Sequence, residues 1–217
     1  LSLHDALPIW QAFPGAAIGS GTPHFFAQLN RIEGLGAVDF LSFTVSSIVH
    51  GADDDAVMHG LQSLPWLVRT VAQDHPGIPL HTGPSAIAAP RSPLGAQPAG
   101  DGIHRIALAQ RDPRTGAMFG AAWLLGHVAG LAQAGAPAVS VLHLLGDQGI
   151  LREGTGTGLH RSPAFHVLQA LAGATHLRRV DTGGSGEVAA LWVTRDSGDS
   201  DGADDTLLLA NLTAEPV

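Results

Sequence analysis

Apolar residues in this chain fall into short runs that alternate with longer runs of helical spacing. From Val38 to Val45 apolar and small polar residues alternate, with aromatic and β-branched side chains among them, which predicts a strand. A helix is expected next, because apolar residues recur at helical spacing and an acid within 53–55 can cap its start. The apolar positions of this helix are Val57, Leu61, Leu64 and Val68. Pro65 lies among them and should kink or restart the helix.

The same alternation continues toward the C-terminus. Residues 78–82 predict a short strand, and residues 83–102, which contain four prolines, predict a long loop. A buried helix is expected from Gly116 to Ala134, opened by residues 112–115 and closed by Gly135. The apolar run 138–145 is typical of a strand buried on both faces.

One further helix completes the helical part of the pattern. A glycine-rich loop is expected over residues 146–158. Ser162 then stands at a cap position and Pro163 at the first helical position, which predicts a helix to about Ala172. Three strand–helix units therefore follow one weaker segment that ends near Leu29. Such alternation predicts parallel strands with right-handed crossovers.

After Thr175 the pattern changes. Residues 187–194 and 206–212 predict two strands, separated by an acidic hairpin loop with no helix between them. Four βα units are about half of an eight-unit barrel. The expected fold class is therefore α/β: the C-terminal half of a (β/α)8 TIM barrel over residues 10–175, followed over residues 176–217 by the start of an antiparallel β-sandwich domain.

The first nine residues predict no part of this fold. The segment Ser2–Ile9 resembles the translation of a sequencing adapter joined to a truncated reading frame, and it lacks the basic region and cleavage site of a signal peptide. We interpret residues 1–9 as an artefact; an ordinary loop and helix start is the alternative. The chain is then expected to be a fragment that is insoluble or self-associating when expressed alone.

Composition excludes several classes of function. The net charge of -8 with only 11 Lys+Arg, unclustered, excludes nucleic acid as a partner. No apolar run approaches the ~20 residues of a membrane span, so no membrane partner is expected. The absence of cysteine excludes thiolate chemistry and fits a cytoplasmic location, although a signal peptide could precede a truncated start.

Reactive groups of parallel barrels lie where the strands end, and His50 stands at such a position with Asp53 and Asp54 after it. A histidine near carboxylates can act as a general base or bind a metal ion. A loop histidine followed by a capping aspartate is the alternative. His81 and His143 also lie at or near strand ends, and a hydrogen-bonded core histidine is the alternative for His143.

Other polar residues at strand ends are candidates for substrate binding. Asn30 and Arg31 can hydrogen-bond a sugar hydroxyl or a carboxylate, or simply cap and solvate a helix start. Asp147 is the best remaining acid for a glycosidase pair. The 12 histidines show no HxH or HExxH spacing, so neither a metal site nor a cofactor is expected.

Four blocks in order resemble the D-apionate lactonases and their relatives. These blocks are Gly19–Thr22 with Phe26–Arg31, Asp39–Thr44 with Val49–Asp54, Asp112–Arg114 with Phe119–Trp123, and Leu208–Thr213. The resemblance covers nearly everything after about residue 18. It implies a glycoside-hydrolase-like barrel with a β-domain that hydrolyses an aldonolactone in sugar catabolism. Gln28 and His143 depart from the family pattern, since carboxylates are expected at both positions.

The leading hypothesis is a lactonase without a cofactor. His50, supported by Asp53 or Asp54, would activate water, and Asn30 or Arg31 would stabilise the oxyanion. The expected substrate site also includes His24, Gln28, His81 and Asp147. The expected catalytic set also includes His143. A retaining glycosidase and an inactive sugar-binding relative are the alternatives. The expected partner is a small sugar lactone or glycoside, and the oligomeric state stays open.

Overall fold

A computed structural model of the chain describes residues 8, 11–33, 38–92, 95–141, 143–153, 158–183, 186–196 and 203–216. Most of the N-terminal stretch interpreted as an artefact, residues 1–7 and 9, lies outside these ranges, so that interpretation stays a prediction. No helix in the described ranges is both long and apolar enough to cross a bilayer.

Parallel strands form one side of the molecule. They are β1 (Gly19–Thr22), β2 (Phe40–Phe43), β3 (Val45–Ser46), β4 (His81–Ala86) and β5 (Ala138–Val141). β1 pairs with β2, and β3, β4 and β5 pair in that order, all in parallel. A single parallel bridge between Leu41 and Leu80 connects the two groups. The parallel pairing predicted from the alternating pattern is confirmed, but the described strands form small, open sheets, not a closed barrel.

The predicted long loop over 83–102 is wrong at its start. Gly83 to Ala86 belong to β4, where Ser85 pairs with Val45 on one side and Val141 on the other. Pro84 is tolerated because the register between β4 and β5 shifts between Thr82 and Ser85, so no ladder hydrogen bond from residue 84 is needed there.

Helices follow the strands, as expected from the sequence. They are α2 (Phe26–Leu29), α3 (Asp54–His59), α4 (Leu64–Asp74), α5 (Met118–Ala134) and α6 (Pro163–Leu171), with 3-10 turns η1 (Gly60–Ser63) and η2 (Pro113–Gly116). Asp53 caps α3 by accepting a hydrogen bond from the Ala56 amide, and Pro65 lies in the first turn of α4. The predicted cap and helix restart are therefore confirmed.

Before the last helix one prediction is corrected, and the predicted cap position is confirmed without its hydrogen bond. Residues 146–158 are not all loop, because they contain β7 (Gly149–Glu153), which pairs in parallel with β6 (His143–Leu145) and antiparallel with β8 (Leu159–Arg161). Ser162 stands at the N-cap of α6, but its buried hydroxyl makes no capping hydrogen bond.

The C-terminal segment forms an antiparallel sheet. Its strands are β9 (His176–Arg179), β10 (Val188–Asp196) and β11 (Ala203–Asn211), in the order β11-β10-β9. The hairpin of β10 and β11 was expected, whereas β9 was not, because its three charged or imidazole-bearing residues hide the apolar alternation.

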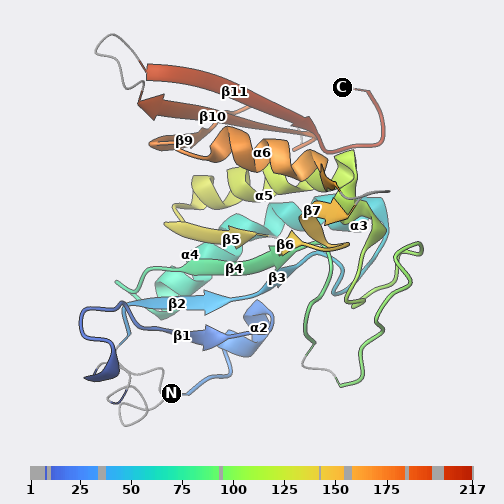
Figure 1. Cartoon of the computed structure of the whole chain (residues 1–217). Helices are drawn as coiled ribbons and strands as arrows, with labels where there is room; N and C mark the ends of the chain where they lie inside the picture. The colour runs from blue at the N-terminus through green and yellow to red at the C-terminus, as the bar shows by residue number, and fades with distance from the viewer. Residues whose placement is uncertain are drawn as a thin grey trace.

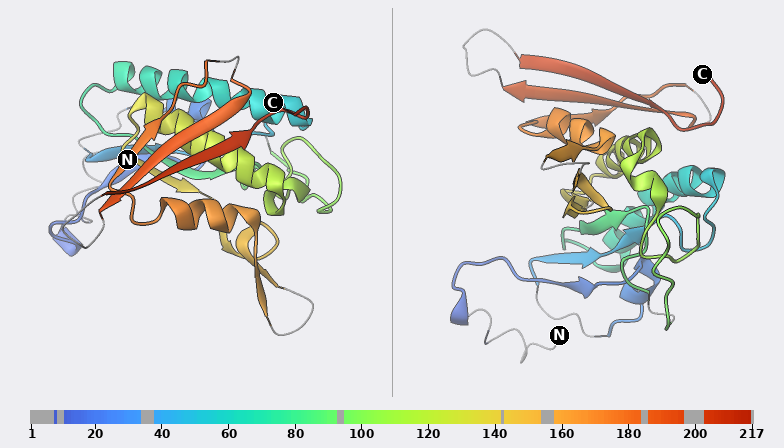
Figure 2. Two further views of the ribbon diagram at one scale, coloured as in Figure 1. Left: turned by 90° about the horizontal axis from the view of Figure 1, so that it is seen from above. Right: turned by 45° about the vertical axis from the view of Figure 1, so that its right-hand side comes forward.

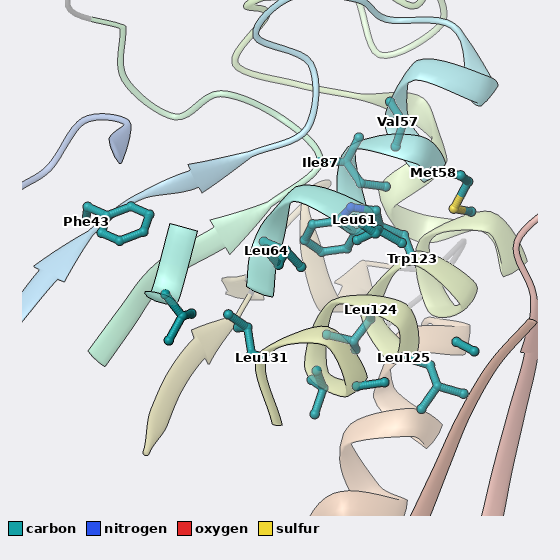
Figure 3. Packing of buried hydrophobic residues seen from close by; sticks show 14 of the residues in the cluster. Phe43, Val57, Met58, Leu61, Leu64, Ile87, Trp123, Leu124, Leu125 and Leu131 are labelled. Atoms are coloured by element: carbon teal, nitrogen blue, oxygen red, sulfur yellow. The ribbon is translucent and has the colours of Figure 1, made fainter. Parts of the chain in front are cut away.

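Helix α5 lies between the parallel strands and the antiparallel sheet (Figures 1 and 2). Nearly every residue from Gly120 to Leu131 is buried, as predicted for an apolar, Ala- and Gly-rich helix. Trp123 and Leu124 on α5 pack with Leu61, Leu64 and neighbouring apolar side chains, as Figure 3 shows. The main hydrophobic core thus surrounds this helix.

Candidate functional site

The loops at the carboxyl ends of the parallel strands lie at one end of the molecule, next to α2 and α3 (Figure 1). The β4–α5 loop (residues 87–112) packs on the loop that follows β3. The Ser47 amide donates to the Ile87 carbonyl over 3.2 Å, and the Leu108 amide donates to the Ile48 carbonyl over 2.8 Å. These bonds hold the two loops side by side where the fold places functional groups.

A buried arginine connects these loops. The guanidinium of Arg114, in η2, donates to both carboxylate oxygens of Asp112, over 2.9 Å and 2.7 Å. Its Nη1 reaches Asp54, in the first turn of α3, over 2.8 Å. Burial disfavours the charge on Arg114, but the bonds to Asp112 and Asp54 outweigh it and raise the arginine pKa. The same carboxylate of Asp54 also pairs with Arg105, from the β4–α5 loop, at 2.9 Å.

Gln148 connects a third loop, the one between β6 and β7, to the residues around Arg114. Its Oε1 accepts from the Asp112 amide and from the Thr115 hydroxyl, each over 3.1 Å. Beside it, Asp147 pairs with Arg111 at 3.1 Å on the exposed surface. The loops that follow β3, β4 and β6 are therefore joined by one polar network centred on Arg114.

His50, the predicted general base, lies exposed on the loop after β3. In the described part of the chain its imidazole makes no hydrogen bond to Asp53 or Asp54, whose carboxylates contact Ala56 and two arginines. The bond from the Ala56 amide lowers the pKa of the exposed Asp53 carboxyl. Asp53 thus has the capping function weighed as the alternative, and a catalytic role of His50 stays a prediction.

Four predicted residues lie after β1. His24 is half-buried, and its Nδ1 has no hydrogen-bond partner among the described residues. Its backbone carbonyl accepts from the Thr44 amide over 2.9 Å, which fixes this loop against the β2–β3 junction. The Arg31 guanidinium donates to Gln28 over 3.5 Å, and Asn30 is exposed at the end of α2. His24, Gln28, Asn30 and Arg31 therefore share one short segment.

The remaining two histidines are on strands. His81, the first residue of β4, stacks on Phe40 of β2 with ring centroids 4.3 Å apart, so it lies at the beginning of its strand and not at the end where it was expected. His143 is exposed on β6, as are Leu144 and Leu145. The single strand predicted over 138–145 is therefore wrong: the run contains two strands in different sheets, β5 and β6. Val139 and Val141 of β5 pack against the core, whereas β6 is exposed, so the expected burial on both faces is wrong as well.

Sequence reasoning missed the residues that actually meet at the loops. The sequence indicated Asp112 and Arg114 only as part of a helix opening and of a family block. It gave no indication of a role for Arg105 or Gln148. The Asp-Pro-Arg run before the buried helix was the signal that could have identified Asp112 and Arg114. Charged side chains beside a buried helix need partners of opposite charge, so this acid and this arginine could have been expected to pair. Among the described residues, no three His, Asp or Glu side chains gather closely enough to bind a metal ion.

Two comparisons with known proteins agree with this architecture. A sequence model described as the TIM barrel domain of D-apionate lactonase matches residues 5–176. A Brucella anthropi protein described as D-apionate lactonase is 35% identical over 170 residues. The aligned part is 75% of this chain and 27% of that protein, so the chain spans about a quarter of the relative's length.

The parallel strands and the domain match together define an α/β protein of the TIM-barrel class. Within that class, the chain belongs to the D-apionate lactonase family.

Proposed function

We propose that this chain is part of a hydrolase that opens a sugar-derived lactone, as in D-apionate lactonase. The observation that carries the proposal is the match of the family's barrel domain over residues 5–176. We further infer that residues 10–175 correspond to about the last four βα units of a barrel and residues 176–217 to the start of a β-domain. The parallel pairs β1-β2 and β3-β4-β5, connected by the Leu41–Leu80 bridge, support this assignment.

The chemistry needs a base and a group that stabilises negative charge. His50 is exposed on the loop that follows the carboxyl end of β3, where its imidazole could accept a proton from a water molecule. That water attacks the lactone carbonyl, and the tetrahedral oxyanion needs hydrogen-bond donors such as Asn30 or Arg31. Collapse breaks the ring C–O bond, and the protonated imidazole of His50 gives its proton to the departing ring oxygen. The products are a free hydroxyl and an aldonic acid, which ionises to the carboxylate and releases one proton.

The carboxylates at the strand ends support a lactonase over a glycosidase. Retaining glycosidases need two carboxyl groups about 5 Å apart, one of them a proton donor. In the described loops Asp54, Asp112 and Asp147 each pair with an arginine, and Asp53 caps a helix. These acids therefore hold the loops together.

An inactive sugar-binding relative is the second candidate. Gln28 and His143 favour it, because both stand where carboxylates are expected in the family. His143 is exposed on β6, and Gln28 contacts Arg31. An enzyme that depends on acids at these two positions would lose its proton transfer here.

A chimera separates these candidates. Residues 10–175 of this chain would replace the matching segment of the Brucella anthropi protein, and proton release from aldonolactones would be followed in a pH-stat. We expect turnover that falls roughly 100-fold or more in His50→Ala, the typical contribution of a general base. His59→Ala, an exposed histidine on α3, is the matched control.

Three outcomes would redirect the assignment. A folded chimera that binds the lactone without hydrolysing it would favour the inactive relative. Hydrolysis of aryl glycosides in place of lactones would favour the glycosidase. Unchanged lactone turnover in His50→Ala would remove His50 from the mechanism, while the lactonase proposal itself would stand.

A further inference from the structure

A cavity of about 400 Å³ lies where η1 and α4 meet α5 and the strands β9 and β10. Its volume is in the range of small-molecule sites, which is about 300–1,000 Å³. Gly126 and Gly130 of α5 line it and contribute no side chain that could fill it. None of the residues predicted for catalysis or substrate binding lines this cavity, so it is separate from the candidate site at the strand ends.

Two arginines from different elements line the cavity. Arg69 lies on α4 and Arg179 lies on β9. Among the described residues, no carboxylate is within ion-pair distance of either guanidinium. No described residue that lines the cavity is Asp or Glu. Two cations at one cavity without a counter-charge repel each other and attract an anion.

Neutral neighbours hold both guanidinium groups in position. Arg69 stacks over the ring of Trp66, with its guanidinium carbon 4.3 Å from the ring centre, and its Nε donates to the Pro65 carbonyl over 3.2 Å. Nη1 of Arg179 donates to the side-chain oxygen of Gln133, near the end of α5. These contacts order the two side chains. The remaining N–H groups of both guanidiniums donate to no described residue and can bind a ligand.

The rest of the lining favours a ligand with an apolar body. Leu61, Ala129 and Ala189 are buried at the wall of the cavity, and Trp66 is 65% exposed beside it. A ligand that packs against these side chains removes apolar surface from water, which is favourable and largest for an aromatic ring. An inorganic anion would leave the same surface exposed.

The charges also determine the orientation and the number of anionic groups. A smaller cavity of about 150 Å³ adjoins at Gln62 and Gly186, and Asp55 and Glu187 line it. A second anionic group would be repelled there, so negative charge is favoured only at the end of the larger cavity where the arginines lie. A single carboxylate fits this end, because it matches the planar donor pattern of a guanidinium.

We propose that this cavity binds a small organic monocarboxylate with an apolar body, whose carboxylate is bound by Arg69 and Arg179 and whose body packs against Trp66 and α5. This ligand class differs from the proposed lactone substrate, which is neutral and rich in hydroxyl groups. The proposal goes beyond lactone hydrolysis and does not depend on it, because binding of a carboxylate here requires no bond to be broken.

Phenylacetate is a suitable probe, and a ligand-observed NMR titration of the chain at neutral pH measures its dissociation constant. We expect saturable binding with a dissociation constant on the order of 1 mM, as is typical of a ligand of this size. The neutral analogue 2-phenylethanol and the small anion acetate should each bind roughly tenfold more weakly. Equal binding of 2-phenylethanol would overturn the role of the arginines, and equal binding of acetate would overturn the role of the apolar body.

Three variants make the test specific. Arg69→Gln and Arg179→Gln should each raise the dissociation constant of phenylacetate roughly tenfold, because each removes a charge-assisted hydrogen bond. Arg178→Gln removes the same charge from the neighbouring exposed position on β9, outside the cavity lining, and should leave the dissociation constant unchanged. The proposal is wrong if phenylacetate shows no saturable binding, or if Arg178→Gln weakens it as much as Arg179→Gln does.

Discussion

The guanidinium of Arg114 holds the buried carboxylate of Asp112 at two points, with Nη2–Oδ2 and Nε–Oδ1 distances of 2.7 Å and 2.9 Å. Both side chains are almost inaccessible to solvent, at 6% and 0% relative exposure. Planar, two-point pairing of this kind is a property of arginine that lysine cannot reproduce. The pair therefore fixes the end of the β4–α5 loop to η2, the turn that precedes α5.

Loss of the arginine should be strongly destabilising. Arg114→Met leaves the carboxylate of Asp112 buried without a counter-charge, and removal of one partner from a buried pair costs about 3–5 kcal/mol. Arg111→Gln is the matched control, because the Arg111–Asp147 pair is half-exposed and worth at most about 1 kcal/mol. Denaturant unfolding measures both. Equal losses in the two variants would contradict the assigned difference in burial.

Acid should destabilise the fold through His127. Complete burial in the middle of α5 lowers the pKa of His127 in the folded chain to about 3, below the ordinary value of 6.5. Stability is therefore fully present above pH 6.5 and falls as the pH drops toward 3. In that window the unfolded chain binds one more proton at this residue than the folded chain does. The free energy of unfolding therefore falls by about 1.4 kcal/mol for each pH unit of acidification. The free energy of unfolding against pH should therefore be flatter in His127→Leu. An identical slope would show that His127 has a protonation partner in the folded chain.

Gly120 in the first turn of α5 should not tolerate a side chain. A Cβ there would lie 2.6 Å from the carbonyl oxygen of Thr115 and 2.7 Å from that of Arg114, so the backbone would have to move. Gly120→Ala should cost about 1–3 kcal/mol, the range of overpacked sites. Gly60→Ala meets open space in a helical conformation and should stabilise by up to about 1 kcal/mol. Denaturant unfolding should therefore show a lower free energy of unfolding for Gly120→Ala and a higher one for Gly60→Ala.

Self-association should depend on β6. Leu144 and Leu145 are 64% and 58% exposed on a short strand, which is a surface prone to pairing. Leu144→Lys should reduce the apparent mass of the chain in light scattering. Met118→Lys, at a similarly exposed apolar position in α5, is the control. A monomeric wild-type chain would contradict this prediction, together with the expected insolubility.

Local patterns predicted most of the fold because they depend on neighbours in the chain. The helical spacing around Val57 and Leu61, the Asp53 cap and the Pro65 restart all appear where expected. The error at Gly83–Ala86 has a tertiary cause. Prolines favour loops, but pairing with β3 and β5 on both sides keeps this segment extended.

The candidate site was harder to predict, because its contacts join distant positions. Asp54 meets Arg114 across 60 residues, so proximity in sequence to His50 suggested the wrong partner for this acid. His127 could be predicted as buried from the apolar helix around it. Neither of its ring nitrogens has a hydrogen-bond partner among the described residues, and this could not be predicted, since it depends on how the loop after β3 and the η1 turn pack against α5.

Helix α5 contacts both the parallel β5 and the antiparallel β9, β10 and β11. A helix shared in this way couples the two sheets thermodynamically. If either sheet detached, it would expose the apolar surface of α5, which also forms the core of the other sheet. The chain should consequently melt in one cooperative transition, and a protease that cuts between α6 and β9 should release no stable piece. The match to the family's barrel domain ends at residue 176. That boundary would then separate two segments of the sequence that fold together as one unit.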